Sequence, residues 1–205
     1  HACLNLLEAG YGIYIVDSLE NSSFESISRI YRFFKEKNKF SVNKIKFFKA
    51  DITNIEKLKI IFEHALSNNQ KINAVLHFAG LKAVSESEEN PIKYWENNVS
   101  GSINLFKVME LYDCKNIVFS SSAAVYGSNQ NCPINEDSSL MPSNVYGKTK
   151  KTIEDILTDL HFRKKWRVAI LRYFNPVGAH HSGIIGENPI SNKNNLFPII
   201  CLSLI

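Results

Sequence analysis

Residues 116–127 read NIVFSSSAAVYG, an apolar segment that runs directly into small and hydroxyl-bearing residues. Asn116–Ser121 is short and rich in Ile, Val and Phe, as is typical of a strand buried on both faces of a parallel sheet. Its end carries Ser120, Ser121 and Ser122. Because ligands of open α/β sheets gather at the carboxyl ends of the strands, the segment predicts a parallel α/β sheet with a site at this edge.

The remainder of the chain alternates between similar strands and helical stretches. Such alternation predicts a doubly wound, Rossmann-like parallel sheet with helices on both faces. The other expected strands are Gly12–Asp17, Lys44–Ala50, Ala74–Phe78 and Val168–Arg172, and the expected helices are Ala2–Ala9, Ser22–Lys37, Ile55–Leu66, Pro91–Leu111 and Val145–Leu160.

The first expected helix has no strand before it. A doubly wound dinucleotide fold begins with a strand and a glycine-rich loop, and this strand lies in the middle of the 3-2-1-4-5-6 sheet. His1–Ala9 resembles instead the second half of an amphipathic helix that ends at Gly10. We therefore expect a fragment that lacks about 10–20 upstream residues, so that the strands at Ile13 and Val75 flank an empty place in the sheet.

Composition narrows the class of protein. The 205 residues are 44% hydrophobic and 21% charged, as in an ordinary globular protein. The formal charge of +4 is spread along the chain, so no nucleic-acid partner is expected. The dispersed cysteines argue against zinc and against a disulfide framework, and they favour a reducing cytoplasm. They are Cys3, Cys114, Cys132 and Cys201.

Metal and membrane sites are not expected either. His180-His181 is the one histidine cluster, and no third ligand stands at a suitable spacing from it. The apolar end, Leu196–Ile205, is too short to span a bilayer, and no signal peptide is visible after His1.

A tyrosine and a lysine four residues apart open the expected helix Val145–Leu160. Tyr146 and Lys150 lie on one face of that helix. A free phenol, with a pKa of about 10, is a poor base at neutral pH, but a nearby ammonium favours the phenolate. Ser122 precedes Tyr146 by 24 residues and can share a substrate proton. The motif predicts proton transfer with a sugar or alcohol hydroxyl, although an isolated Tyr-x-x-x-Lys is more often an ordinary helix surface.

Two aspartates end strands where a cofactor could bind. Asp17 can accept hydrogen bonds from an adenosine ribose, and its charge repels a 2′-phosphate, so it favours NAD over NADP. A plain strand end or helix cap is the alternative for Asp17. For Asp51, an adenine contact competes with capping of the next helix by Asp51 or Thr53, together with Glu56.

Several motifs together carry a family resemblance. HFAGLKAV at 77–84 and RYFNPVGA at 172–179 are the most telling, with further support from VDSLENS at 16–22, ENNV at 96–99, and the segments 119–127 and 146–150. The chain resembles the UDP-glucose (UDP-galactose) 4-epimerases of the extended short-chain dehydrogenase/reductase superfamily. The resemblance implies a truncated NAD-binding domain over residues 1–172 and the beginning of a truncated substrate-binding domain over residues 173–205.

The resemblance implies an isomerase that inverts C4 of UDP-galactose and UDP-glucose in galactose metabolism, by a transient 4-keto sugar and tightly held NAD. Tyr146 would be the catalytic base and acid, Ser122 its partner, and Lys150 the residue that binds the nicotinamide ribose and lowers the tyrosine pKa. The implied NAD contacts are Asp17, Ser18, Asn21, Ser22, Asp51, Ile52, Phe78, Ala79, Gly80, Lys82, Asn97, Ser122, Tyr146, Lys150 and Phe174. The implied UDP-hexose contacts are Lys82, Ser122, Tyr146, Asn175 and Asn195.

Other functions compete with this one. Another nucleotide-sugar epimerase, a 4,6-dehydratase or a decarboxylase could share the motifs. Dehydratases of the superfamily place an Asp-Glu pair beside the catalytic serine or threonine, whereas this chain has Ala123-Ala124. A catalytically inactive NAD-binding protein is the alternative from another class, but such proteins typically lose the tyrosine or the lysine. Without the glycine-rich loop, we expect the 205-residue fragment by itself to be inactive.

Association is also expected. The segments Asn104–Met109 and Ile153–Leu157 carry apolar residues beyond one inward stripe. Two such helices per subunit could form a four-helix bundle across a two-fold axis, as in dimers of the family. The alternative is that these residues simply pack on the sheet.

Overall fold

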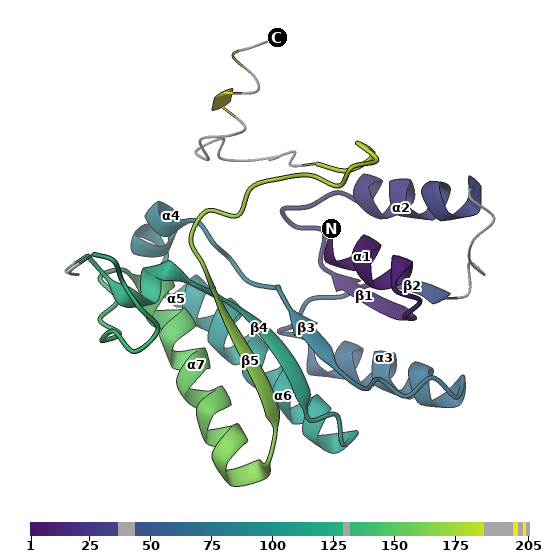
Figure 1. The fold of residues 1–205 in the computed structure, drawn as a ribbon. Coiled ribbons are helices and arrows are strands. Elements are labelled where there is room, and N and C mark those ends of the chain that lie inside the picture. Colours follow the sequence, from purple (N-terminus) through teal and green to yellow (C-terminus); the bar gives the residue numbers. More distant parts are fainter. Residues whose placement is uncertain (37–43, 129–131, 187–198, 201–202, 204–205) are drawn as a thin grey trace. The chain divides into compact units, whose positions relative to one another are not determined.

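The computed structural model describes residues 1–36, 44–128, 132–186, 199–200 and 203. The chain divides into two compact units, one formed by residues 1–50 with the residues from 176 onward, and one by residues 51–175 (Figure 1). Each unit has its own parallel sheet. The expected boundary between cofactor and substrate domains, at residues 172 and 173, stays a prediction.

The first unit contains helix α1 (Ala2–Glu8), strand β1 (Ile13–Asp17), helix α2 (Glu25–Glu36) and strand β2 (Ile45–Lys49). The strands pair in parallel from Ile13 opposite Ile45 to Asp17 opposite Lys49. Apolar side chains from all four elements form one core, in which Ile185 also takes part. The core members are Leu4, Leu7, Ile13, Ile30, Phe33, Phe34, Ile45 and Ile185.

The second unit is built around a three-stranded sheet in the order β3-β4-β5. His77 pairs with Phe119 and Ser122 with Tyr173, so the three strands end at the same edge. In chain order its elements are α3 (Ile55–Ser67), β3 (Val75–His77), α4 (Val84–Glu89), α5 (Pro91–Tyr94), a π-helical segment (Trp95–Ser100), α6 (Gly101–Leu111), β4 (Asn116–Ser122), a 3₁₀ turn (Ala123–Tyr126), α7 (Val145–Lys164) and β5 (Arg167–Tyr173).

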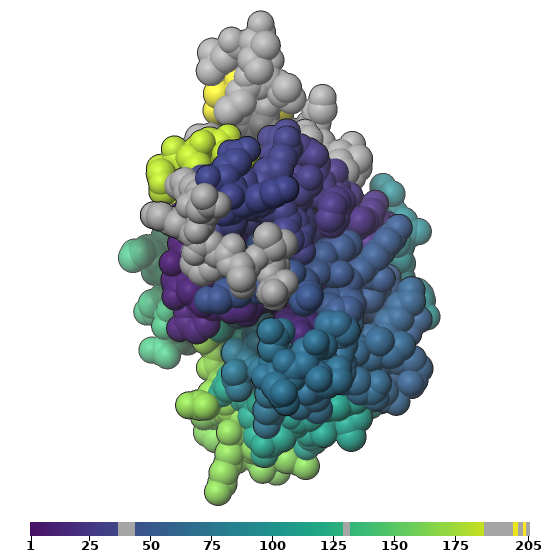
Figure 2. Space-filling model, turned by 90° about the vertical axis from the view of Figure 1, so that its right-hand side faces the viewer, coloured from purple at the N-terminus to yellow at the C-terminus, as the bar shows by residue number. Residues whose placement is uncertain are grey.

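Helices cover this second sheet closely. Helix α7 contacts β4 and β5, while α3 packs against α6. Between α3 and the end of α6, the rings of Phe62 and Tyr112 stack at 5.4 Å and the Tyr112 hydroxyl donates to Glu63 at 3.0 Å. In the space-filling view of Figure 2, the part of the chain coloured blue to green forms a continuous packed surface.

The predicted α/β fold is confirmed, and each of the five expected strands is present with its bounds shifted by at most one residue. Within the described ranges, β1-β2 and β3-β4-β5 form separate sheets. The expected empty place in the sheet stays a prediction. The helix expected over Pro91–Leu111 is interrupted by the π-helical segment. The buried Asn98 side chain in that segment bonds to the chain after β3, which accounts for the local distortion.

The apolar residues that suggested a dimer lie inside the 51–175 unit. They pack within their own chain, as the alternative interpretation predicted, so these positions supply no separate evidence for association. The buried residues of this set are Leu105, Phe106, Val108, Met109, Ile153 and Leu157.

None of the helices in the described ranges is both long and apolar enough to cross a membrane. Within the same ranges, no three His, Cys, Asp or Glu side chains are grouped closely enough to hold a metal ion.

Gly147 sets how closely α7 approaches the 3₁₀ turn. A Cβ atom at this position would lie 2.7 Å from the Ala124 carbonyl oxygen and 3.0 Å from the Pro142 Cβ. Gly147→Ala should therefore lower the free energy of unfolding of the full-length protein by about 1–3 kcal/mol through overpacking, measured by urea denaturation. Helix propensity alone predicts a gain of about 1 kcal/mol.

The matched control is Lys148→Ala, at the exposed neighbouring position of the same helix. Its free energy of unfolding should stay close to that of the wild type. A stability gain in Gly147→Ala would show that propensity outweighs the contact with Ala124.

Candidate active site

Helix α7 begins at a site that other elements hold in place. Backbone N–H groups in the first turn of a helix need acceptors from outside the helix. Here three side chains supply them: Asn144 to Gly147 (2.7 Å), Ser87 to Tyr146 (3.1 Å) and Glu88 to Val145 (2.7 Å). Because Ser87 and Glu88 belong to α4, that helix fixes the start of α7 and hence the position of Tyr146.

The three serines at the end of β4 each contact a different turn of α7. Ser122 lies beside the Tyr146 phenol and lowers its pKa, and its Oγ also accepts from the Ala124 N–H at 3.2 Å. Lys150 Nζ donates to the Ser120 carbonyl oxygen at 2.8 Å, and Ser121 Oγ donates to Glu154 at 2.5 Å. Positions 146, 150 and 154 share one helix face. The structure therefore brings together the three residues for which the sequence predicted catalysis, Ser122, Tyr146 and Lys150.

Lys150 is buried, with only 5% of its surface exposed. Its Nζ lies 4.9 Å from the centroid of the Phe119 ring and 5.8 Å from that of Tyr146. Burial lowers the pKa of Lys150 to about 8, because the ammonium loses hydration that these neighbours replace only in part. Near neutral pH this lysine can exchange a proton far more readily than a surface lysine.

The pKa of Tyr146 departs from the prediction. Burial raises the pKa of its phenol above the usual value, and the hydrogen bond with Ser122 lowers it in part. The sequence predicted a net lowering by Lys150. In the structure Lys150 is directed toward the Ser120 carbonyl, so desolvation of the phenol outweighs the attraction of the ammonium.

Asn98 joins the loop after β3 to α7. The sequence did not predict this role, because the expected NAD contact was the neighbouring Asn97. Its Oδ1 accepts from the Leu81 N–H at 2.8 Å, and its Nδ2 donates to the Leu81 carbonyl at 3.0 Å and to Thr149 Oγ1 at 3.2 Å. Thr149 Oγ1 in turn donates to the Tyr146 carbonyl at 2.7 Å. Two adjacent asparagines inside an expected helix were the signal available, because a buried asparagine needs several partners.

The loop after β3 leaves the sheet at the same edge as Ser122. Phe78 is 49% exposed, and Lys82 is also exposed. Gly80 has a φ of +149°, and a Cβ there would lie 3.1 Å from Asn98 Oδ1. The positive φ and the close approach of Asn98 favour glycine at this point, and the predicted cofactor contacts of the loop stay a prediction.

In the other unit, Asp17 organises the turn after β1. Its Oδ1 accepts from the Leu19 N–H at 2.8 Å and from Ser22 Oγ at 2.7 Å, while Ser18 Oγ accepts from Glu20 at 3.3 Å. The adjacent Asn21 is exposed. Asp17 thus holds the turn at the end of the strand and is also a candidate acceptor for a ribose. Both hydrogen bonds to its carboxylate use Oδ1, and Oδ2 accepts none within the described ranges.

Asp51 does not cap α3. The cap is Asn54, whose side chain accepts from the Lys57 N–H at 3.0 Å, so the prediction of Asp51 or Thr53 as the cap was wrong. Asp51 Oδ1 instead accepts from the N–H of Thr53 at 2.8 Å and from its hydroxyl at 2.7 Å. Ile52 is buried and lies against Gly101. Its side chain therefore packs in the interior.

Past β5, two predicted contact residues lie on the surface. Phe174 is 63% exposed, with its ring 6.4 Å from that of Tyr126, and Asn175 is also exposed. Asn195 lies outside the described residues. The rings of His180 and His181 lie 4.0 Å apart with a tilt of 43°, and His180 also contacts Ser182 and Glu8.

His77 is a buried titratable group directly beneath the site. It is 2% exposed, and its Nε2 lies 2.8 Å from Ser102 Oγ. Burial, and then the charge of Lys150, lower the pKa of His77 to about 3. Between pH 3 and the ordinary value near 6.5 the unfolded chain binds a proton that the folded chain does not, so stability is complete above this window and falls as the pH falls through it.

We predict that His77→Leu removes this dependence. In urea denaturation at a series of pH values, the wild type should lose up to about 1.4 kcal/mol per pH unit more than the variant between pH 6 and pH 4. Ser102 keeps its bond to the Asn98 carbonyl in the variant, so no new buried hydroxyl is left without a partner. Parallel curves for the two proteins would contradict the prediction.

Known proteins share both the sequence and the arrangement. The sequence pattern of the family described as GDP-mannose 4,6 dehydratase matches residues 1–195. UDP-glucose 4-epimerase 2 of Arabidopsis thaliana and UDP-glucose 4-epimerase of Bacillus subtilis are each 45% identical over 98% of this chain. The chain spans 55% and 56% of the lengths of these two relatives.

Among solved structures, UDP-glucose 4-epimerase from Stenotrophomonas maltophila superimposes with a TM-score of 0.86 at 40% identity. The match covers all of this chain and 59% of that protein, whose crystals hold NAD and formylated UDP-arabinopyranose. The chain belongs to the GDP-mannose 4,6 dehydratase family, and the relatives that it matches at 40–45% identity are UDP-glucose 4-epimerases.

Proposed function

We propose that the full-length protein is an NAD-dependent UDP-glucose 4-epimerase that interconverts UDP-glucose and UDP-galactose in galactose metabolism. The observation that carries the proposal is the contact of Ser122 with Tyr146 at the end of β4, above the buried Lys150. The solved epimerases support the ligand classes, because those of Stenotrophomonas maltophila and Bifidobacterium longum hold NAD with a UDP-sugar or UDP.

The chain's own residues would carry the proton transfers. Tyr146 would take the proton from the 4-hydroxyl oxygen of the sugar and later return it, acting as base and then as acid. Ser122 would share that proton and favour the phenolate through its hydrogen bond. Bound NAD would supply the hydride acceptor for C4 of the sugar and the donor for the return of the hydride to its other face.

Each unit offers residues of the kind that a dinucleotide needs. In the unit of residues 1–50, Asp17 offers a carboxylate at the end of β1, where an adenosine ribose binds in this type of fold. In the unit of residues 51–175, Phe78 exposes a flat apolar surface after β3. Lys150 Nζ reaches the carboxyl edge of the sheet, where it would hold the nicotinamide ribose.

A dehydratase is the nearest alternative, and the description of the family makes it a serious one. Removal of water from the sugar needs an acid and a base beside the catalytic serine. In the described structure those places belong to Ala123 and Ala124 in the 3₁₀ turn, whose methyl groups cannot move a proton. Formation of a 4-keto-6-deoxy product from a nucleotide sugar would favour the dehydratase instead.

Tyr146→Phe tests the proposal most directly. The variant keeps the ring that Lys150 approaches, so folding and NAD binding should stay close to wild type. Loss of the hydroxyl should lower kcat by about 10²–10⁴-fold, as expected for a general acid–base residue. The measurement is a coupled assay of UDP-galactose conversion by the full-length protein, with NAD content determined separately.

Tyr112→Phe is the matched control. It removes a phenol hydroxyl from the surface pair with Glu63, so kcat should not change. Near-wild-type turnover in Tyr146→Phe would refute the catalytic assignment. A wild-type protein that holds NAD but converts no UDP-galactose would refute the epimerase proposal as a whole.

The proposal extends to a homodimer in the cytoplasm. Dispersed free thiols, including buried Cys114, suit a reducing compartment. The dimer rests on the family resemblance. Light scattering of the full-length protein at micromolar concentration should give twice the mass of one chain, and a monomer mass would contradict it.

A further inference from the structure

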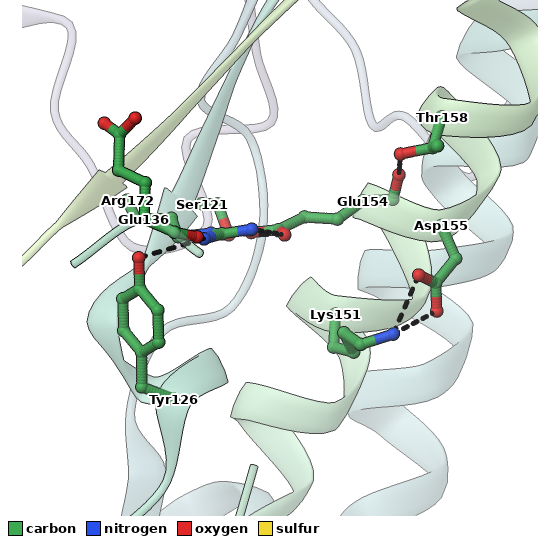
Figure 3. Close-up of polar contacts among 8 residues, drawn as sticks. All are labelled: Ser121, Tyr126, Glu136, Lys151, Glu154, Asp155, Thr158 and Arg172. Atoms are coloured by element: carbon green, nitrogen blue, oxygen red, sulfur yellow. Dashed lines mark hydrogen bonds and ion pairs between the residues drawn. The ribbon is translucent and has the colours of Figure 1, made fainter. Parts of the chain in front are cut away.

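Glu154 is a buried carboxylate two turns beyond Tyr146 on α7. It is 2% exposed, and its carboxylate accepts hydrogen bonds from two residues, Arg172 and Ser121 (Figure 3). Arg172 of β5 donates from Nη2 to Oε2 at 2.8 Å and from Nε to Oε1 at 3.1 Å, and Ser121 of β4 donates to Oε1. The side chain thus joins one helix to two neighbouring strands at the edge that carries the site.

Arg172 extends this network beyond the strands. Its Nη1 donates to the Tyr126 hydroxyl at 2.9 Å and to the Glu136 carbonyl oxygen at 3.2 Å. Tyr126 closes the 3₁₀ turn that begins directly after Ser122. One guanidinium therefore holds the turn that follows the catalytic serine as well as the carboxylate on α7.

A buried ion pair of this kind fixes geometry more than it adds stability. Desolvation of both charges offsets much of their attraction, but the bidentate contact between Arg172 and Glu154 fixes the orientation of the two side chains. The exposed pair Lys151–Asp155, one position further along the same helix, has a similar distance of 2.7 Å but stands in water (Figure 3). Such surface pairs constrain little.

We propose that Glu154, Arg172 and Ser121 are positioning residues of the epimerase site, a role that rests on the proposed function. Glu154 holds Ser121, and Arg172 holds the turn after Ser122, so the end of β4 is fixed against α7 on both sides of the catalytic serine. This arrangement keeps the Ser122 side chain beside the Tyr146 phenol, whose pKa it lowers.

A test must separate positioning from stability, and the pH dependence of turnover does so. The Ser122 bond lowers the pKa of Tyr146 against the effect of burial. Among the described residues, Lys150, 5.8 Å from its ring, and Tyr94 are ionisable groups near this phenol. If Ser122 drifts, the pKa of Tyr146 rises, and the rising limb of kcat against pH moves to higher pH.

The decisive variant is Ser121→Ala in the full-length enzyme. It removes the hydrogen bond from β4 to Glu154 and leaves the ion pair between Glu154 and Arg172 intact. We expect kcat for UDP-galactose to fall about 10-fold, with KM within about two-fold of wild type and the rising pH limb displaced upward. Glu154→Gln should show the same pattern with a loss of about 100-fold, since it also releases Arg172.

Asp155→Asn serves as the matched control, since it removes a carboxylate from the same helix outside the network. Its kcat, KM and pH profile should equal those of the wild type. If Glu154→Gln fails to fold, Ser121→Ala decides alone.

Two outcomes overturn different claims. Suppose that Tyr146→Phe loses turnover but Ser121→Ala keeps the kcat of the wild type and the same rising pH limb. The network would then have only a structural role. A wild type without epimerase turnover would overturn the proposed function, and the positioning role with it.

Discussion

The contact between the end of β4 and one face of α7 is the constraint on which the site depends. Ser120 meets Lys150 through its carbonyl oxygen, Ser121 meets Glu154 and Ser122 meets Tyr146, so three consecutive residues at the end of the strand contact one face of a helix. A shift of one residue in the strand would turn the Ser121 side chain to the opposite face and break its bond with Glu154. The bonds of Asn98 to Leu81 and Thr149 support this alignment.

Burial explains why so much of that unit is devoted to polar pairing. Lys150, Glu154, Asn98 and His77 are all nearly inaccessible, and a buried polar group is costly unless it is hydrogen-bonded. Each of them has a partner: a carbonyl, a guanidinium, a backbone amide group or a hydroxyl. Because each buried polar group needs its own hydrogen-bond partner, few other packings of these side chains are possible. The site is therefore expected to be rigid.

The sequence predicted the strands and the Ser122, Tyr146 and Lys150 trio because both depend on local pattern. Short apolar runs define buried strands, and a four-residue spacing places side chains on one helix face. It did not predict the roles of Asn98 and Glu154, whose partners Leu81 and Arg172 lie 17 and 18 residues away along the chain. The direction of the Tyr146 pKa was missed for a similar reason, since burial is a property of the packed unit.

A few residues next to Ser122 would then decide between the two reactions considered above, while the β4–α7 contact would be needed for either. Under the proposed function, the pairing of β4 with α7 and the contact of Asn98 with the loop after β3 would place Tyr146 at a sugar hydroxyl without deciding the later steps. The 3₁₀ turn that follows Ser122 begins with Ala123 and Ala124, while the Tyr126 hydroxyl at its end is bonded to Arg172. The two alanines directly after Ser122 could not protonate a leaving hydroxyl, so return of the hydride would be the open course for an oxidised sugar. This part of the turn would thus favour epimerisation over loss of water.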